Sequence, residues 1–265
     1  ALLRKINLAA KQRMLSQRVG LTVCLVSTGA EPSLNLDKAR GAIDLFRRTL
    51  DGLRDGDTDL GLVRENSDHV LDALGRVETL WRLFEGKADH LLANVDLTGG
   101  TIDRTALADF RSTAGLVLAE MNRATQIIVS VYAEALTRPE LAATLNIAGR
   151  QRMLIQKVAM DACFAVSVPD DRDVATSVKD TTDLFQTSLA ALFLGDQDKG
   201  VIKPPTSQVE DALLQVVRMW RWLGPDLGKV TDGEVFTKRD LALLARAADV
   251  VLGRMNDAVE LYESG

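Results

Sequence analysis

The chain has 265 residues, a formal net charge of −5 and only two histidines and two cysteines. Hydrophobic residues make up 46% and charged residues 26%, which excludes a disordered chain. The net negative charge excludes a dedicated nucleic-acid-binding protein, which needs an excess of Lys and Arg to match phosphates. A histidine-rich metal centre is excluded because His69 and His90 are the only histidines. No apolar run approaches the roughly 18 residues of a membrane span.

Eight segments of helical length follow one another and are separated by residues that break helices. The first four helices are expected near 3–28, 33–54, 64–93 and 102–137, and the other four near 140–167, 171–194, 206–223 and 235–263. Ser33 is expected to cap the second helix, and loops are expected at 55–57 and 99–100. No window alternates as a strand requires, so the sequence predicts an all-α fold.

The second half of the chain repeats the first half. Residues 6–18 read INLAAKQRMLSQR and residues 145–157 read LNIAGRQRMLIQK, at an offset of 139. The same offset aligns Cys24 with Cys163, and an offset of 134 later aligns Met121-Asn122 with Met255-Asn256. Because the register is kept over such a length, the chain is a duplicated domain with boundaries at 1–138 and 139–265.

Each repeat is expected to form one bundle, because four long helices joined by short loops pack up-down-up-down. An even number of helices brings the chain back to the end where it began, so the last helix should end near the start of the first. The junction Thr137-Arg138-Pro139 is short. We therefore expect two tandem up-down-up-down four-helix bundles, packed as a parallel covalent pseudo-dimer.

Arg13 and Arg152 lie at equivalent positions on the first helix of each repeat, within a stripe of small apolar residues. At 100° per residue the stripe contains Ile6, Ala9, Gly20 and Cys24 in one repeat and Leu145, Ala148, Ala159 and Cys163 in the other. Small residues let another helix approach closely, so the stripe is expected to face a partner helix. Arg18 and Lys157 lie on another face, which is expected to be solvated.

Two interpretations of the paired arginines stay open. In one, internal carboxylates or carbonyl groups satisfy them, although the first helix supplies no acid and its counterpart only Asp161. In the other, a small anion lies between them. Two guanidinium charges about 8 Å apart repel by about 2 kcal/mol at an effective dielectric constant near 20. An anion would remove that cost and accept charge-assisted hydrogen bonds.

The two arginine-containing segments resemble the N-terminal signature of the type IV pili methyl-accepting transducer family (PilJ-type domains). They also resemble the related P-box of periplasmic nitrate/nitrite sensor kinases. The resemblance implies a non-enzymatic, periplasmic sensor that binds nitrate, or else nitrite, through one arginine of each repeat, here Arg13 and Arg152. It further implies a signalling partner, such as a sensor kinase, transducer or regulator, and neither a cofactor nor a metal.

The resemblance also assigns the neighbours of the arginines. Ala10 replaces the P-box glycine that Gly149 keeps, and Ser16 is replaced by Ile155, so the pocket is expected to be asymmetric. The candidate ligand-binding residues are Arg13, Arg152, Ala9, Ala10, Ala148 and Gly149, surrounded by Asn7, Asn146, Ser16, Gln17 and Gln156. Asn7 and Asn146 either cap their helices or reach the pocket.

Other functions agree less well with the sequence. Paired carboxylates, a nucleophile elbow and a phosphate loop are absent, so no enzyme is expected. A phosphotransfer bundle needs an exposed histidine in a basic setting, which His69 beside Glu65 and Asp68 does not supply. The remaining alternative is a helical interaction scaffold that docks on a transducer, with structural arginines and no small ligand.

Three paired features are interpreted as structural. Trp81 and Trp220 are expected in the core. The aspartates at 57, 59, 196 and 198 are expected to cap helices, because the calcium-loop pattern is incomplete. The two cysteines are expected to be buried and reduced, since helices 8–10 Å apart usually hold cysteines too far apart to bond, although a disulfide across the interface is the alternative.

Overall fold

The structure is a computed structural model that describes residues 2–93, 103–136, 139–168, 172–234 and 236–264. Its α-helices are α1 (Leu2–Thr28), α2 (Pro32–Asp55), α3 (Asp68–Ala93), α4 (Arg104–Tyr132), α5 (Glu140–Ser167), α6 (Arg172–Leu194), α7 (Ser207–Thr231) and α8 (Lys238–Ser264). A 3₁₀ turn, Ala133–Ala135, follows α4. The described ranges contain only two isolated β-bridges and no strand, so the all-α class is confirmed. No helix among them is both long and apolar enough to span a membrane.

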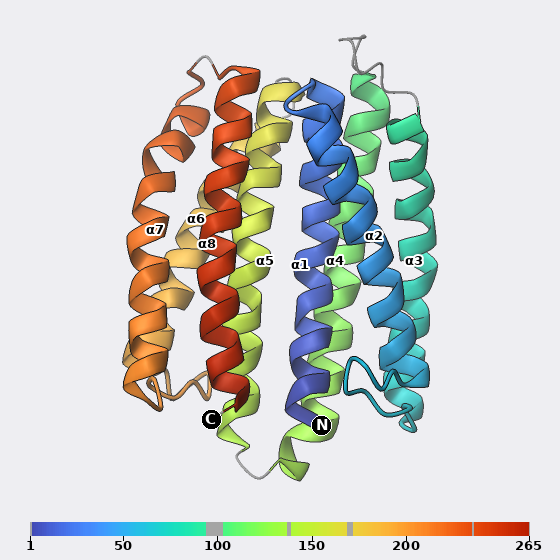
Figure 1. Ribbon diagram of the computed structural model, residues 1–265, viewed down its shortest axis with the longest axis vertical. Coiled ribbons are helices and arrows are strands. Elements are labelled where there is room, and N and C mark those ends of the chain that lie inside the picture. Colours follow the sequence, from blue (N-terminus) through green and yellow to red (C-terminus); the bar gives the residue numbers. More distant parts are fainter. Residues whose placement is uncertain (1, 94–102, 137–138, 169–171, 235, 265) are drawn as a thin grey trace.

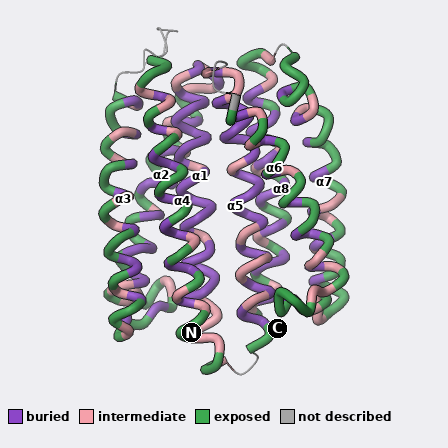
Figure 2. The backbone as a smooth tube through the Cα atoms, turned by 180° about the vertical axis from the view of Figure 1, so that it is seen from behind, coloured by how far each residue is buried: buried purple, intermediate pink, exposed green. Residues whose placement is uncertain are grey.

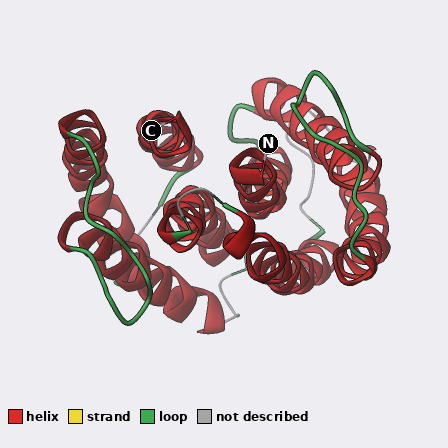
Figure 3. Ribbon diagram, turned by 90° about the horizontal axis from the view of Figure 1, so that it is seen from below, coloured by secondary structure: helices red, strands yellow, loops and turns green. Residues whose placement is uncertain are grey.

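The first helices of the two repeats lie side by side at the centre of the molecule (Figure 1 and Figure 3). α1 packs against α2 and α4, and α5 packs in the same way against α6 and α8. Both central helices are buried around most of their circumference, whereas the outer helices alternate buried and exposed positions (Figure 2). A helix that is apolar on most sides requires such a central position.

The two chain ends lie close together at the same end of the molecule, as the even number of helices predicts (Figure 1). Arg4 on α1 forms an ion pair of 3.5 Å with Glu263 on α8. Glu263 also accepts a hydrogen bond from the side-chain amide of Asn7. The last turn of the second repeat therefore contacts the first turns of the first repeat.

Each repeat contains the same aromatic pair in its core. The rings of Phe46 and Trp81 are stacked with centroids 3.5 Å apart, and those of Phe185 and Trp220 with centroids 3.8 Å apart. Both tryptophans are buried, which confirms the prediction that they are core residues. The stacked rings fix the second and third helices of each repeat against each other.

Several predicted boundaries were wrong. Ser33 is not the cap of α2, because Glu31 adopts a left-handed conformation (φ 48°) and Pro32 begins the helix without a side-chain cap bond. α7 does not end near 223 but continues through Pro225 to Thr231. It does so because Leu227 and Val230 extend its buried face, and their burial offsets the hydrogen bond that proline removes.

The remaining differences concern the ends of α3 and α4. α3 begins at Asp68 instead of 64, because the backbone N–H groups of Asn66 and Ser67 bond to the carboxylate of Glu65. α4 ends at Tyr132 instead of 137. The predicted loop at 99–100 and most of the junction between the repeats, residues 137–138, lie outside the described residues.

The expectation of two reduced cysteines was wrong, because Cys24 and Cys163 form a disulfide between α1 and α5. Their Cα atoms are 6.3 Å apart, within the range that a disulfide requires. The helices come this close because small residues line the contact. A Cβ on Gly20 would lie only 2.3 Å from Sδ of Met160. The usual helix spacing therefore did not apply here.

The aspartate-rich loops form turns, and the expectation that their aspartates cap helices was wrong, because α3 begins only at Asp68 and Thr206 caps α7. Oδ1 of Asp57 accepts a hydrogen bond of 3.0 Å from the backbone N–H of Leu60, and Oδ1 of Asp196 accepts one of 3.1 Å from that of Lys199. Arg48 forms ion pairs with both Asp57 and Asp59. Within the described residues, no group of three or more His, Cys, Asp or Glu side chains is arranged to hold a metal ion.

Candidate anion site between the repeats

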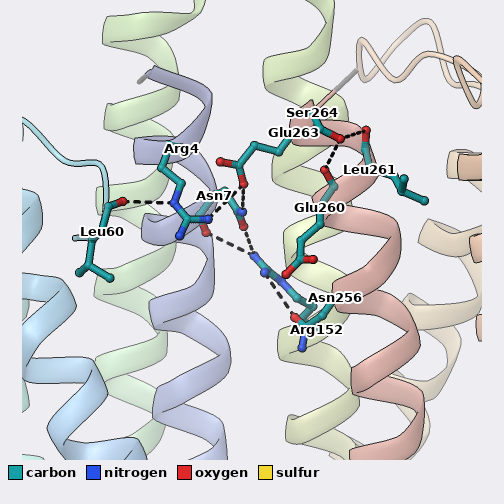
Figure 4. A network of polar contacts seen from close by, with 9 residues as sticks. All are labelled: Arg4, Asn7, Leu60, Arg152, Asn256, Glu260, Leu261, Glu263 and Ser264. Carbon is teal, nitrogen blue, oxygen red and sulfur yellow. Dashed lines mark hydrogen bonds and ion pairs between the residues drawn. The ribbon is translucent and has the colours of Figure 1, made fainter. Parts of the chain in front are cut away.

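Each arginine of the pair bonds to the asparagine of the opposite repeat. Nη2 of Arg13 donates to Oδ1 of Asn146 at 2.9 Å and to its carbonyl oxygen at 3.1 Å. Nη2 of Arg152 donates to the same two atoms of Asn7, at 2.7 Å and 3.3 Å (Figure 4). The open question about the asparagines is thus answered, since both side chains reach the arginines across the interface.

A second asparagine lies against each guanidinium. Nη1 of Arg13 donates to Oδ1 of Asn122 on α4 at 3.4 Å, and Nη1 of Arg152 donates to Oδ1 of Asn256 on α8 at 3.5 Å. In the sequence these asparagines help to align the repeats, but that alignment did not predict that they lie at the site. The signal that could have placed them is that the same residue recurs at equivalent positions of both fourth helices.

Both guanidinium groups are buried and keep unbonded donor atoms. Arg13 and Arg152 are each 3% exposed, and neither Nε has a hydrogen-bond partner. Burial, with the nearby Arg150 and Arg152, lowers the pKa of Arg13 to about 9. Burial also lowers the pKa of Arg152 to about 10, although Glu263 and Glu260 oppose that shift. In the described part of the chain, neither arginine forms an ion pair with a carboxylate.

The two guanidinium groups converge on Gly149. A Cβ placed on Gly149 would lie 3.4 Å from Nη2 of Arg152 and 3.7 Å from Nη2 of Arg13. It would also lie only 2.6 Å from Cβ of Ala10, so α1 and α5 approach closely at this point because position 149 has no side chain. Ala9 and Ala148, which flank this contact, are fully buried.

Further cations surround the pair. Lys11 and Arg150 occupy equivalent positions, two residues before each arginine. Burial and the nearby Arg152 lower the pKa of Lys11, and burial lowers that of Arg150. Nη2 of Arg150 donates to Oγ of Ser188 at 3.1 Å, but its Nε has no partner. We call Lys11, Arg13, Arg150 and Arg152 the cationic cluster.

The other predicted neighbours lie beside the arginines without bonding to their guanidinium groups. Oγ of Ser16 donates to the carbonyl oxygen of Arg13 at 2.8 Å, and Nε2 of Gln17 donates to Oγ of Ser16 at 3.2 Å. Gln156, fully buried, has no hydrogen-bond partner for either side-chain polar atom. The replacement of Ser16 by Ile155 thus removes both of these bonds from the second repeat, which leaves Gln156 without the partner that Gln17 has.

The expectation of a solvated face around Arg18 and Lys157 was wrong. Arg18 forms an ion pair of 3.1 Å with Asp249, and its side chain is 23% exposed. Lys157 forms an ion pair with the buried Asp161. Both cations are partly covered, because Asp249 on α8 lies against Arg18 and Ser177 on α6 lies against Lys157.

The fold and the site define the class of protein. It consists of an all-helical domain that is duplicated in tandem, with a cationic cluster between the first helices of the two repeats. The sequence model of the family described as "Type IV pili methyl-accepting chemotaxis transducer N-term" (PilJ) matches residues 4–98 and 139–240. The chain belongs to this family, and it contains two copies of the domain, a sensory and signalling type. A search of curated proteins finds no match.

Proposed function

We propose that the protein is a sensor that binds a small planar oxyanion between its two repeats, nitrate first and nitrite second. The observation that supports this proposal best is the convergence of Arg13 and Arg152 on one point. Both Nη2 atoms lie within 4 Å of the position that a Cβ on Gly149 would occupy, and both Nε atoms lack a partner. Two like charges that are buried together need an anion to compensate them.

A trigonal anion suits this arrangement. Its oxygens lie in one plane and can accept paired hydrogen bonds from a planar guanidinium fork on each side. The asparagines are neutral, so an anion that displaces their bonds replaces an uncharged acceptor with a charged one. Tetrahedral sulfate and phosphate are larger, and the buried Ala9 and Ala148 leave little room for them.

The proposed setting is the periplasm, with a sensor kinase, transducer or regulator as the signalling partner. The resemblance of both segments to the P-box suggests this setting. The disulfide between Cys24 and Cys163 is consistent with it, because disulfides persist in oxidising compartments. Anion binding would change the contact between α1 and α5, which is the contact that joins the two repeats.

The competing interpretation is a helical interaction scaffold whose arginines serve only the fold. The asparagine bonds agree with that interpretation, but the unbonded Nε atoms and the absence of an ion pair at either guanidinium in the described residues do not. A structural arginine is expected to have its buried donors satisfied. Mutation separates the two interpretations.

The test is thermal melting with and without nitrate. At a hundredfold excess over its dissociation constant, nitrate should stabilise the wild type by about 2.7 kcal/mol, a shift of several degrees. Arg13→Ala and Arg152→Ala should show no shift, and without nitrate they should melt no lower than the wild type. The exposed Arg40→Ala removes the same charge and should respond as the wild type does. Mutants that melt much lower yet still respond to nitrate would refute the proposal.

A further inference from the structure

One asparagine of the site connects it with a surface pocket. Asn122 accepts the hydrogen bond from Arg13 and also lines a pocket of about 510 Å³ between α4, α5 and α6. Asn122 is half-buried, so it is in contact both with the buried guanidinium and with the pocket that opens to solvent. The pocket thus reaches to within one side chain of the arginine pair.

The pocket contains groups of both charges. Nζ of Lys157 lies in its wall, where it donates to Oγ of Ser177 at 2.7 Å and pairs with Asp161. Asp173 and Asp180 also line the pocket. Their charges do not attract an anion, but the pocket offers it open space, and in physiological salt the repulsion from the two carboxylates is screened beyond about 8 Å.

The equivalent face of the other repeat is built differently. There Asp249 on α8 forms ion pairs with Arg18 on α1, at 3.1 Å, and with Lys38 on α2, at 2.7 Å. All three side chains are less than a third exposed. This arrangement, which we call the Asp249 bridge, ties α1, α2 and α8 together over the face that leads to Asn256.

The sequence prevents the same bridge on the pocket side. At the offset of 134, Gly115 stands where Asp249 stands, and a Cβ on Gly115 would meet nothing within 4 Å. At the offset of 139, Ser177 stands where Lys38 stands. Because the acid on the fourth helix and the lysine on the second are both replaced, the equivalent of the Asp249 bridge cannot form between α4, α5 and α6.

We propose that the site exchanges its anion with solvent on one side only, through the α4–α5–α6 pocket and past Asn122, while the Asp249 bridge holds the equivalent route closed. The inference rests on the proposed function for the identity of the anion, but the asymmetry of access can be tested without it. It makes Gly115 and Asp249 determinants of the exchange rate, although neither bonds to Arg13 or Arg152.

The first test compares Asn122→Cys with Asn256→Cys. The native cysteines are disulfide-bonded, so the introduced thiol is the only free one in the described chain. We expect the anionic reagent sulfonatoethyl methanethiosulfonate to modify the Asn122→Cys variant at least tenfold faster. Adding Asp249→Gly should accelerate modification of the Asn256→Cys variant to a similar rate. If either asparagine variant fails to fold, Leu118→Cys and Leu252→Cys are the matched replacements. Equal rates for the two positions would overturn the inference, whether or not the protein binds nitrate.

The second test builds the bridge on the open side. Gly115→Asp combined with Ser177→Lys should slow nitrate association and dissociation at least tenfold and leave the dissociation constant unchanged, because the new ion pair does not touch the anion. Nuclear magnetic resonance exchange measurements report both rates. Unchanged rates in a double variant that binds nitrate would contradict the inference. A wild type that binds no nitrate would refute the proposed function, and the thiol rates would still decide the access route.

Discussion

Gly149 of α5 faces Ala10 of α1 so closely that a Cβ on the glycine would lie 2.6 Å from Cβ of the alanine. The two positions are equivalent in the repeats, so one repeat supplies a methyl group and the other the space that receives it. The methyl group of Ala10 is therefore complementary to the missing side chain of Gly149. It leaves the helices close enough for both arginines to converge.

Exchanging these two residues should preserve the contact, whereas changing one should not. Gly149→Ala alone forces two methyl groups together and should lower the free energy of unfolding by about 1–3 kcal/mol. In the double variant Ala10→Gly/Gly149→Ala the clash is absent. Its free energy of unfolding should therefore recover most of what Gly149→Ala alone loses. Chemical denaturation of the single and double variants measures the coupling. Strictly additive effects would show that the two positions do not meet.

The disulfide between Cys24 and Cys163 should stabilise the protein strongly, because it closes a loop with a sequence separation of 139. Replacing both cysteines by serine should lower the free energy of unfolding by about 2–5 kcal/mol. A reducing agent should lower the melting temperature of the wild type and leave that of the double variant unchanged. A thiol count on the denatured, unreduced protein should give zero. Two free thiols would contradict the pairing.

Acid should destabilise the first bundle through Glu65. Burial alone would raise the pKa of this carboxyl, but hydrogen bonds from Lys5, Tyr132 and the backbone N–H of Ser67 outweigh it and hold the pKa below its ordinary value. Because the pKa is lowered on folding, Glu65 contributes stability above its unfolded pKa, near 4.5, and this contribution is lost as the pH falls through the folded value.

Melting temperatures between pH 6 and pH 3 check this effect. The wild type should lose more stability below pH 4.5 than Glu65→Gln, which cannot titrate at this position. The second repeat offers a matched comparison, since Thr144 and Pro204 stand where Lys5 and Glu65 stand. The acid-sensitive step should therefore appear in amide exchange of α1, α3 and α4. A Glu65→Gln variant with the same pH profile as the wild type would show that the buried pair does not cause it.

The sequence was sufficient to predict the helices and the duplication, because hydrophobic periodicity and internal repetition can be read from the chain alone. It did not predict the disulfide, because helix spacing depends on which residues face each other across the contact, such as the glycine Gly20 that leaves room for Met160. The path of α7 through Pro225 was missed because the burial of later residues decided it. The asparagines at 122 and 256 were missed since their role depends on the packing of the fourth helices.

The protein should bind its anion as a monomer, because both halves of the site lie on one chain. Sedimentation of the nitrate-saturated protein at low concentration should give the mass of a single 265-residue chain. Arg13 bonds to residues on α4 and α5 and Arg152 to residues on α1 and α8, so neither needs a second molecule. Dimerisation that is obligatory for binding would contradict a site formed within the chain.

Calorimetric titration with nitrate tests the shared site most directly. The wild type should bind one nitrate per chain, and Arg13→Ala and Arg152→Ala should each lose most of the affinity, since each removes charged hydrogen bonds that contribute about 1.5–3 kcal/mol. Arg13→Lys should lose nearly as much, because a point charge does not reproduce the guanidinium fork. One site per chain that requires both arginines is the predicted result. No binding, two sites per chain, or a single site that survives the loss of either arginine would contradict the account.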